Sequence, residues 1–220
     1  MSADPTVRRL VLLRHGQTAW NAERRAQGHS DVEIDATGHA QAAAVAPYVA
    51  AMRPSLLWSS DLSRARQTAA YVAAATGLEV RTDPRLREYD LGERTGMTMA
   101  EYAVAHPEEY RAFRAGSYDV VPGGETTAQV VARVVETARE ALTALAPGRC
   151  GVLVAHGAAL KVSVVALLGW PTEAAPSLQA LDNCGWAELH DSGDGGQLRL
   201  AAWNRVVPAA PDFATDEGVG

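Results

Sequence analysis

Two apolar segments of the chain each end in a histidine followed by a glycine. Residues 10–13 lead into Arg14-His15-Gly16, and residues 150–155 lead into His156-Gly157. Histidine suits nucleophilic or proton-transfer chemistry near neutral pH, and arginine is a permanent cation that forks onto phosphate or carboxylate oxygens. One such histidine alone is equally compatible with a surface turn. Two in the same context favour a site that handles an anion.

The elements around both histidines explain how they would be positioned. Both apolar runs have the length and branching of buried strands, so each histidine follows the carboxyl end of a strand. Ligands bind at that edge of open α/β sheets. Residues 158–168 have helical composition. The start of that helix offers free N–H groups and a positive dipole end to an anion.

An arginine follows a third predicted strand, residues 56–58. Residues 59–61 provide cap-forming side chains, and a helix is predicted over residues 62–76. Arg64 falls in its first turn, and Thr68 lies one turn later on the same face, where it is expected to line the same pocket. A solvated helix arginine is the ordinary alternative for Arg64.

A carboxylate, Glu88, lies in a loop after a short edge strand predicted over residues 79–81. A lone loop glutamate is normally solvated, so its candidacy depends on Arg14, Arg64 and the two histidines. Two arginines and two histidines around one point would trap a dianion such as phosphate. A neutral histidine beside cations can attack phosphorus, and a nearby carboxyl group can protonate the departing alkoxide.

The other predicted elements alternate in the α/β manner. Further strands are expected at residues 7–13, 187–189 and 198–203, and further helices at residues 38–52, 98–102, 107–116 and 129–145. Pro47 is expected to kink or break the first of these helices. Gly77 is a plausible C-cap for the Arg64 helix. We predict a three-layer α/β/α sandwich with a mostly parallel central sheet, as one domain over residues 1–206.

The ends and one loop are expected to lack regular structure. Residues 1–6 and the polar acidic tail 207–220 are predicted to be disordered, and residues 191–196 form a hairpin loop rich in Gly and Asp. An apolar stripe on the 129–145 helix is expected to be core; it consists of Val130, Val131, Val134, Ala138, Ala141 and Leu145.

Bulk composition excludes several classes of protein. The 220 residues carry a formal net charge of -6, which argues against general binding to nucleic acids or anionic membranes. Lys161 is the only lysine. Cys150 and Cys184 form neither a zinc pattern nor a CxxC pair, and no metal is expected. Free thiols, together with no signal-like or membrane-length apolar run, favour a cytoplasmic protein.

The chain resembles the histidine phosphatase superfamily, which includes the cofactor-dependent phosphoglycerate mutases. The resemblance covers about residues 8–203 and implies a phosphoglycerate mutase-like fold. It rests on LRHGQTAWN (13–21), SSDLSRARQT (59–68), LREYDLG (86–92), PGGET (122–126) and VAHG (154–157).

The resemblance implies a role for each matching residue. His15 resembles the nucleophile that becomes phosphohistidine, and Glu88 resembles the donor to the leaving group and later the base for water. The other phosphate-pocket residues would be Arg14, Arg64 and His156. The substrate side would be lined by Asn21, Gln27 and Gly28, with Gly157 and Ala158 presenting backbone amides to phosphate. Glycine rather than aspartate after His156 is typical of the mutase-like branch.

Hydrolysis is favoured over mutase activity. Mutases of this family carry an insertion after the acidic residue, with a lysine and an adjacent arginine pair that hold the substrate carboxylate. Here no lysine lies between Glu88 and Glu125, and Arg111 and Arg114 are not adjacent. We therefore predict a metal- and cofactor-independent phosphatase acting on small phosphorylated metabolites. A phosphoglycerate mutase and a non-catalytic phospho-ligand-binding protein are the alternatives, and a homodimer is compatible with the sequence.

The chain departs from the family pattern at one point. An aromatic residue and then an acidic or amide residue are expected between Gly92 and Gly96, but Arg94 and Thr95 stand there. Arg94 adds a positive charge near the predicted pocket mouth, which would favour an acidic substrate. Simple exposure of Arg94 to solvent is the alternative. Overall length and Gln27-Gly28 look most like the broad-specificity and glucosyl-3-phosphoglycerate phosphatases of this family.

Overall fold

The computed structural model describes residues 6–115, 117, 119–191 and 198–207. Its centre is a six-stranded sheet of order β3-β2-β4-β1-β5-β6. The strands are β1 (Arg8–Arg14), β2 (Pro54–Ser59), β3 (Arg81–Thr82), β4 (Cys150–Ala155), β5 (Trp186–Asp191) and β6 (Arg199–Arg205). The first four run parallel, and β5 and β6 extend the sheet in antiparallel fashion. The predicted α/β class with a mostly parallel sheet is confirmed.

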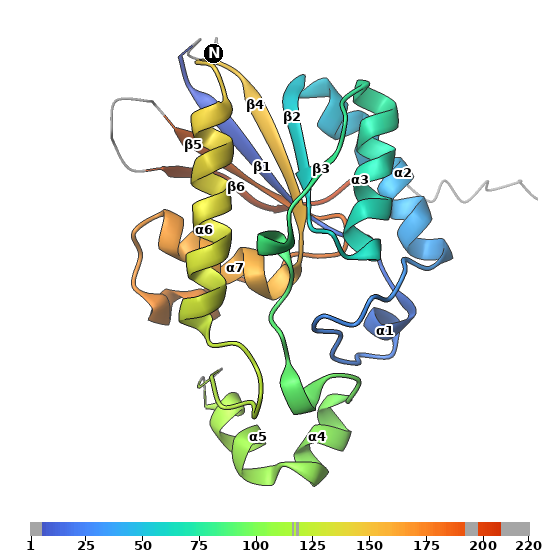
Figure 1. Cartoon of the computed structure of the whole chain (residues 1–220), viewed down its shortest axis with the longest axis vertical. Helices are drawn as coiled ribbons and strands as arrows, with labels where there is room; N and C mark the ends of the chain where they lie inside the picture. Colours follow the sequence, from blue (N-terminus) through green and yellow to red (C-terminus); the bar gives the residue numbers. More distant parts are fainter. Residues whose placement is uncertain (1–5, 116, 118, 192–197, 208–220) are drawn as a thin grey trace, which may run out of the picture.

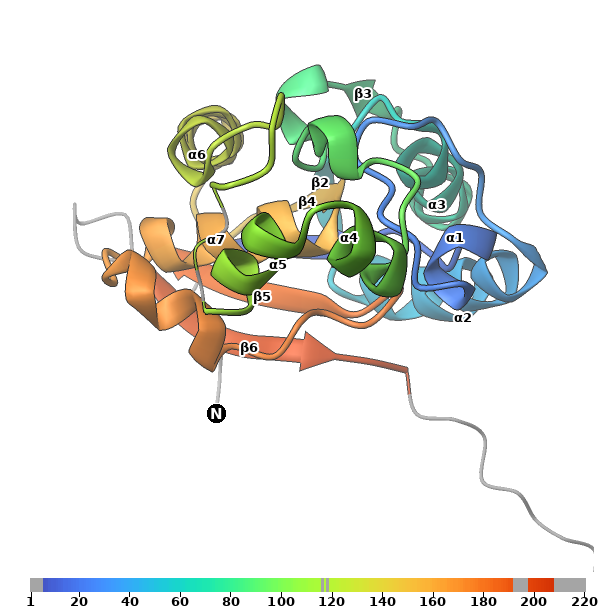
Figure 2. The same cartoon turned by 90° about the horizontal axis from the view of Figure 1, so that it is seen from below.

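Helices cover both faces of this sheet. Helices α2 (Ala36–Ala51) and α3 (Ser63–Thr76) lie on one face, and α6 (Thr127–Ala144) and α7 (Gly157–Leu167) lie on the other (Figures 1 and 2). Because successive strand side chains point to opposite faces, β1 serves both layers. Leu10 and Leu12 pack in the α6–α7 core, whereas Val11 and Leu13 pack in the α2–α3 core.

The apolar stripe of α6 is core, as predicted. Val130, Val134, Ala138 and Ala141 are buried, while Val131 packs at the margin. Thr126 caps the helix by accepting a hydrogen bond from the Gln129 amide, and the Gln129 side chain accepts one from the Thr126 amide in return.

Short helices lie beyond the carboxyl ends of the parallel strands. They are α1 (Ala19–Ala22), α4 (Met99–Ala105), α5 (Pro107–Arg114) and the 3₁₀ helices Pro84–Leu86, Gly92–Arg94 and Thr172–Ser177. Helices α4 and α5 form a small lobe below the sheet (Figure 1). In the sequence, this lobe follows the loop that carries Glu88 and precedes α6.

Two local predictions were wrong, and one short helix was missed. Helix α2 passes through Pro47 without a break, since Val45 and Val49 bury its inner face on both sides of the proline. Helix α1 was not predicted, because its single turn depends on a reciprocal cap between Thr18 and Asn21.

The predicted cap of α3 is also absent. Leu62 occupies the N-cap and supplies no side-chain hydrogen bond. Asp31 accepts hydrogen bonds from the Ser63 amide at 2.6 Å and from the Ser63 hydroxyl at 2.9 Å instead. A residue distant in sequence therefore accepts the hydrogen bond of a free amide at the start of α3. The Gly77 C-cap, with φ of 72°, agrees with the prediction.

Some predicted features lie outside the described residues: most of the 1–6 lead-in, Gly116, residues 192–196 of the hairpin loop and the tail from residue 208. Within the described ranges, no helix is both long and apolar enough to cross a bilayer.

Candidate active site

The turn after β1 is locked between two other elements. The Gly16 amide donates to the Thr68 hydroxyl of α3 at 2.9 Å. On the other side, a Cβ on Gly16 would lie 2.6 Å from the carbonyl oxygen of Gly38 at the start of α2. Only glycine permits this close backbone approach. Thr68, predicted to line the pocket, is fully buried and holds the turn.

This turn also sets the protonation of His15. Its Nδ1 lies 2.7 Å from the Gly16 carbonyl oxygen. A carbonyl oxygen only accepts, so Nδ1 carries the hydrogen and Nε2 of the neutral ring keeps its lone pair. The ring is 3% exposed. Burial, reinforced by Arg14 and Arg64, holds the pKa of His15 well below its ordinary value of 6.5.

His156 lies behind His15, with 5.1 Å between the ring centroids. Arg64 Nε donates to its Nδ1 at 3.2 Å, which leaves the hydrogen on Nε2, 2.9 Å from the Ser60 hydroxyl. The ring is fully buried, and burial and Arg64 hold its pKa well below 6.5. Its contacts fix the Arg64 guanidinium, and it is absent from the described lining of the cavity beside His15.

Arg64 is buried to 1% exposure, which excludes the solvated alternative. Besides His156, it donates to the Ser30 carbonyl at 2.7 Å and to the Gly28 carbonyl at 2.8 Å. Burial lowers its pKa to about 10, so it remains a cation at neutral pH. Three of its five N–H groups therefore have protein partners, and two remain for an anion.

Arg14 approaches the site from the end of β1. Its Nη1 donates to the Leu181 carbonyl at 2.5 Å. Its side chain passes so close to Gly157 that a Cβ there would lie 3.2 Å from Nε. That Nε is buried and has no hydrogen-bond partner among the described residues. Burial lowers the pKa of Arg14, although Glu88 and Asp182 oppose the shift.

Glu88 caps the start of α7. Its carboxylate accepts hydrogen bonds from the Ala159 amide at 2.8 Å and from the Ala158 amide at 3.1 Å. The Ala158 amide, which was predicted to meet phosphate, donates to Glu88 in this arrangement. The reason is that a helix N-terminus attracts the nearest carboxylate as readily as it attracts an anionic ligand.

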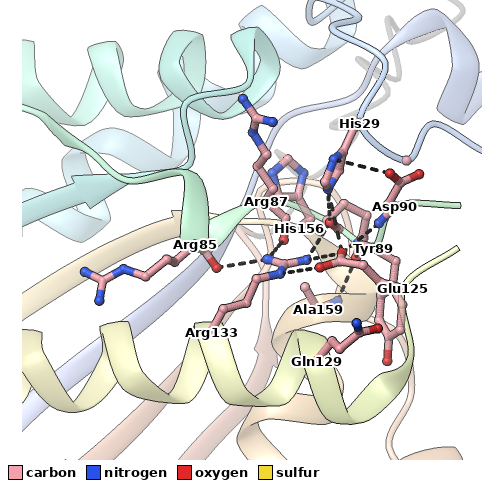
Figure 3. A network of polar contacts seen from close by, with 12 residues as sticks. His29, Arg85, Arg87, Tyr89, Asp90, Glu125, Gln129, Arg133, His156 and Ala159 are labelled. Carbon is pink, nitrogen blue, oxygen red and sulfur yellow. Dashed lines mark hydrogen bonds and ion pairs between the residues drawn. The ribbon is translucent and has the colours of Figure 1, made fainter.

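An ion pair that was not predicted holds the Glu88 loop (Figure 3). Arg133 of α6 binds both oxygens of Glu125, at 2.9 and 2.7 Å. It also donates to the carbonyls of Arg85, Arg87 and Glu88 at 2.9, 2.5 and 2.7 Å. Burial opposes ionisation of Glu125, but Arg133 keeps its pKa below the usual value. Three backbone carbonyls within residues 85–88 are thus bound to one guanidinium.

Sequence reasoning gave no role to several other residues that support the site. Asn183 donates to the His15 carbonyl at 3.1 Å and approaches Asn21 Oδ1 at 3.3 Å. His29 lies 2.8 Å from the Glu88 carbonyl. Ser60 and Glu125 lie within two of the motifs shared with the family, SSDLSRARQT (59–68) and PGGET (122–126), so the sequence held a signal for both. Asn183, in contrast, stands in no motif and reaches the site only through the turn before β5.

A cavity of about 350 Å³ opens beside these groups. Nine of the ten predicted site residues line it, and these are Arg14, His15, Asn21, Gln27, Gly28, Arg64, Glu88, Gly157 and Ala158. His156 is the exception. The remaining lining includes Arg94, Phe113 and Lys161. Arg94 is half-buried, so simple exposure does not describe it. In the described part of the chain, no three His, Cys, Asp or Glu side chains are grouped to hold a metal ion.

Comparison with known proteins identifies relatives along nearly the whole chain. Residues 10–205 match the model of the histidine phosphatase superfamily (branch 1). The glucosyl-3-phosphoglycerate phosphatase of Mycolicibacterium vanbaalenii is 38% identical over 221 residues, which cover 94% of this chain and 98% of the relative. A probable phosphoglycerate mutase of Yersinia enterocolitica is 37% identical over 214 residues, 90% of this chain and 98% of the relative.

The fold is also shared with solved structures. A mycobacterial glucosyl-3-phosphoglycerate phosphatase in complex with VO3 superimposes with a TM-score of 0.82 at 37% identity. The match covers 90% of this chain and 98% of that one.

Proposed function

Because the chain belongs to the histidine phosphatase superfamily and is a phosphoric monoester hydrolase, we propose that it works through a phosphohistidine formed on His15. The hydrogen bond of 2.7 Å between His15 Nδ1 and the Gly16 carbonyl carries this proposal. It leaves Nε2 of a neutral ring as the free nucleophilic atom. Arg14 and Arg64 flank the ring and balance the charge of an incoming phosphate.

The proposed reaction has two steps. In the first, His15 Nε2 forms a bond to phosphorus while the phosphorus–oxygen bond to the alcohol breaks, and Glu88 gives its proton to that oxygen. In the second, Glu88 takes a proton from water, which attacks the phosphohistidine and releases inorganic phosphate and the free imidazole. The proton that Glu88 takes from water in the second step restores its acid form for the next turnover.

Glu88 is positioned for both steps. It lines the same cavity as His15 and is held by the amides of α7, while Arg133 and Glu125 fix the backbone on either side. Arg133 and Glu125 are thus proposed as positioning residues. His156 is proposed to orient Arg64 through their 3.2 Å hydrogen bond.

We propose a small phosphorylated sugar acid as the substrate class. Support comes from the relatives named glucosyl-3-phosphoglycerate phosphatase, which match this chain over more than nine-tenths of its length. Asn21, Gln27 and Gly28 are the proposed contacts on the substrate side. Gln27 Oε1 is buried and lacks a hydrogen-bond partner in the described structure, so it is available to a substrate hydroxyl. Phosphoglycerate mutase activity is less supported. Two buried free thiols, Cys150 and Cys184, support a reducing, cytoplasmic setting.

Phosphohistidine is hydrolysed in acid, so the test uses an alkaline quench after the enzyme is mixed with ³²P-labelled substrate. We expect label on His15 and its loss in His15→Ala, together with a fall in phosphate release of at least about 10³-fold. The exposed His39→Ala variant is the control. Label on another residue, or full turnover by His15→Ala, would refute the mechanism. A parallel assay of phosphate exchange between phosphoglycerates tests the mutase alternative.

A further inference from the structure

We infer that Arg94 and Lys161 form a second anion subsite in the outer part of the cavity, which binds a carboxylate of the substrate. This rests on the proposed function, because the phosphoryl group is taken to lie between His15, Arg14 and Arg64. Arg94, Lys161 and His15 line the same cavity. The inference assigns these two cations a role in specificity rather than in the chemical step.

The cavity has room for much more than the phosphoryl group. A phosphate displaces the volume of roughly two to three water molecules, about 60 to 90 Å³. The cavity measures about 350 Å³, and its lining also includes the apolar residues Leu91, Phe113, Val121 and Val162. The remaining space and these apolar side chains therefore fit an organic portion of the substrate.

The charge of the lining is strongly one-sided. Among the described lining residues are five cations, Arg14, Arg25, Arg64, Arg94 and Lys161, and one carboxylate, Glu88. The whole chain, in contrast, has a net charge of -6. Arg25 is neutralised by Glu23 and Glu101 at 3.2 and 3.1 Å. A dianionic phosphate accounts for Arg14 and Arg64, which leaves Arg94 and Lys161 without an anion.

Arg94 is a half-buried donor with no oxygen acceptor among the described residues. Its Nη2 contacts the thioether sulfur of Met99 at 3.1 Å. Its Nε is buried without a hydrogen-bond partner, and no carboxylate of the described chain lies within 4 Å of it. Its Cζ lies 4.5 Å from the centroid of the Phe113 ring and 5.6 Å from that of Tyr102.

These rings hold the guanidinium in place by cation–π contacts. A planar, immobilised guanidinium matches a planar carboxylate through two parallel hydrogen bonds. A phosphate can pair with a guanidinium in the same way, so the choice of a carboxylate rests on the proposed sugar-acid substrate class.

Lys161 approaches the cavity from α7. It lies four residues after Gly157, so it follows the phosphate end of the helix by about one turn on the same face. It is half-buried and has no acidic partner among the described residues, and burial lowers its pKa. A cation that is partly removed from water and unpaired gains from an anionic ligand.

The test uses two ligands that share one skeleton. 3-Phosphoglycerate carries a carboxylate where glycerol 3-phosphate carries a hydroxymethyl group. Their dissociation constants are measured by calorimetry in the His15→Ala background, which prevents turnover, so the result does not depend on catalysis. The measured quantity is the ratio of the two constants, which is insensitive to the fraction of folded protein.

We expect the ratio to favour 3-phosphoglycerate and to fall by about 10-fold or more in Arg94→Gln, and by a smaller factor in Lys161→Met. The control is Arg111→Gln on the exposed part of α5, which should leave the ratio unchanged. Equal weakening of both ligands, or an unchanged ratio in both pocket variants, would overturn the inference. Preference for a bisphosphate over 3-phosphoglycerate would overturn the choice of a carboxylate. Failure of the proposed function appears separately, as absent phosphate release by the unmodified chain.

Discussion

Replacement of Glu88 by glutamine separates the two proposed uses of this carboxylate. Glutamine keeps the shape of the side chain but can neither donate a proton to a leaving alkoxide nor accept one from water. An alkoxide needs that proton, whereas p-nitrophenolate leaves readily without it. General acid–base catalysis contributes about 10² to 10⁴-fold, or roughly 2.7 to 5.5 kcal/mol of the barrier. The loss in phosphorylation of His15 should therefore be of this size for an alkyl phosphate and under about tenfold for p-nitrophenyl phosphate.

The appropriate assay is pre-steady-state mixing, because steady-state rates include the second step. Hydrolysis of phosphohistidine also needs Glu88, so steady-state turnover of both substrates should fall. With p-nitrophenyl phosphate, Glu88→Gln should release a rapid burst of about one p-nitrophenolate per active site, followed by slow turnover. With an alkyl phosphate such as glycerol 3-phosphate, no burst should appear.

The same substitution has a structural effect that must be measured alongside. The carboxylate accepts the Ala158 and Ala159 amides at 3.1 and 2.8 Å at the start of α7. Removing its charge should cost about 1 kcal/mol of unfolding free energy, or about 2 to 4 °C in Tm for a chain of this size. Glu93→Gln, in the following 3₁₀ helix Gly92–Arg94 and outside the described cavity lining, is the matched control. Burst kinetics that are equally slow for aryl and alkyl phosphates would refute the proton-donor role.

Two further outcomes are expected. Arg133→Met removes five hydrogen bonds and leaves the Glu125 carboxylate, 22% exposed, without its main partner, so the free energy of unfolding, measured by chemical denaturation, should fall by roughly 2 to 4 kcal/mol. The double variant Arg133→Met with Glu125→Gln should recover part of this stability, but its turnover of alkyl phosphates should stay impaired. Full recovery of turnover in the double variant would contradict the positioning role. Burial keeps His15 and His156 neutral in the folded protein, whereas in the unfolded chain both histidines take up protons below their ordinary pKa of 6.5. The free energy of unfolding should therefore fall as the pH falls. Between pH 6.5 and 5.5 the loss is about 1 kcal/mol per histidine, and His15→Gln should show about half the total; an unchanged slope in that variant would contradict the assignment.

The candidate site was largely predictable because its residues follow local signals. His15 and His156 each end a run of apolar residues whose length indicates a strand, and parallel strands bring their carboxyl ends to one edge. The same reasoning placed Arg64 on the following helix. The apolar stripe of α6 was readable for a similar reason, since periodicity involves residues only a few positions apart.

Other features depend on contacts between distant segments, so they were decided only by the tertiary structure. Asp31 caps α3, Glu88 occupies the start of α7, and Arg133 fastens a loop more than 40 residues away in sequence. The hydrogen position on the imidazoles of His15 and His156 likewise depends on which acceptor or donor the fold places beside each ring. The sequence by itself therefore determined which groups are available at the sheet edge, because their positions follow from backbone periodicity. The fold alone decided their protonation, orientation and charge balance, because these arise from burial and from partners that no local pattern specifies.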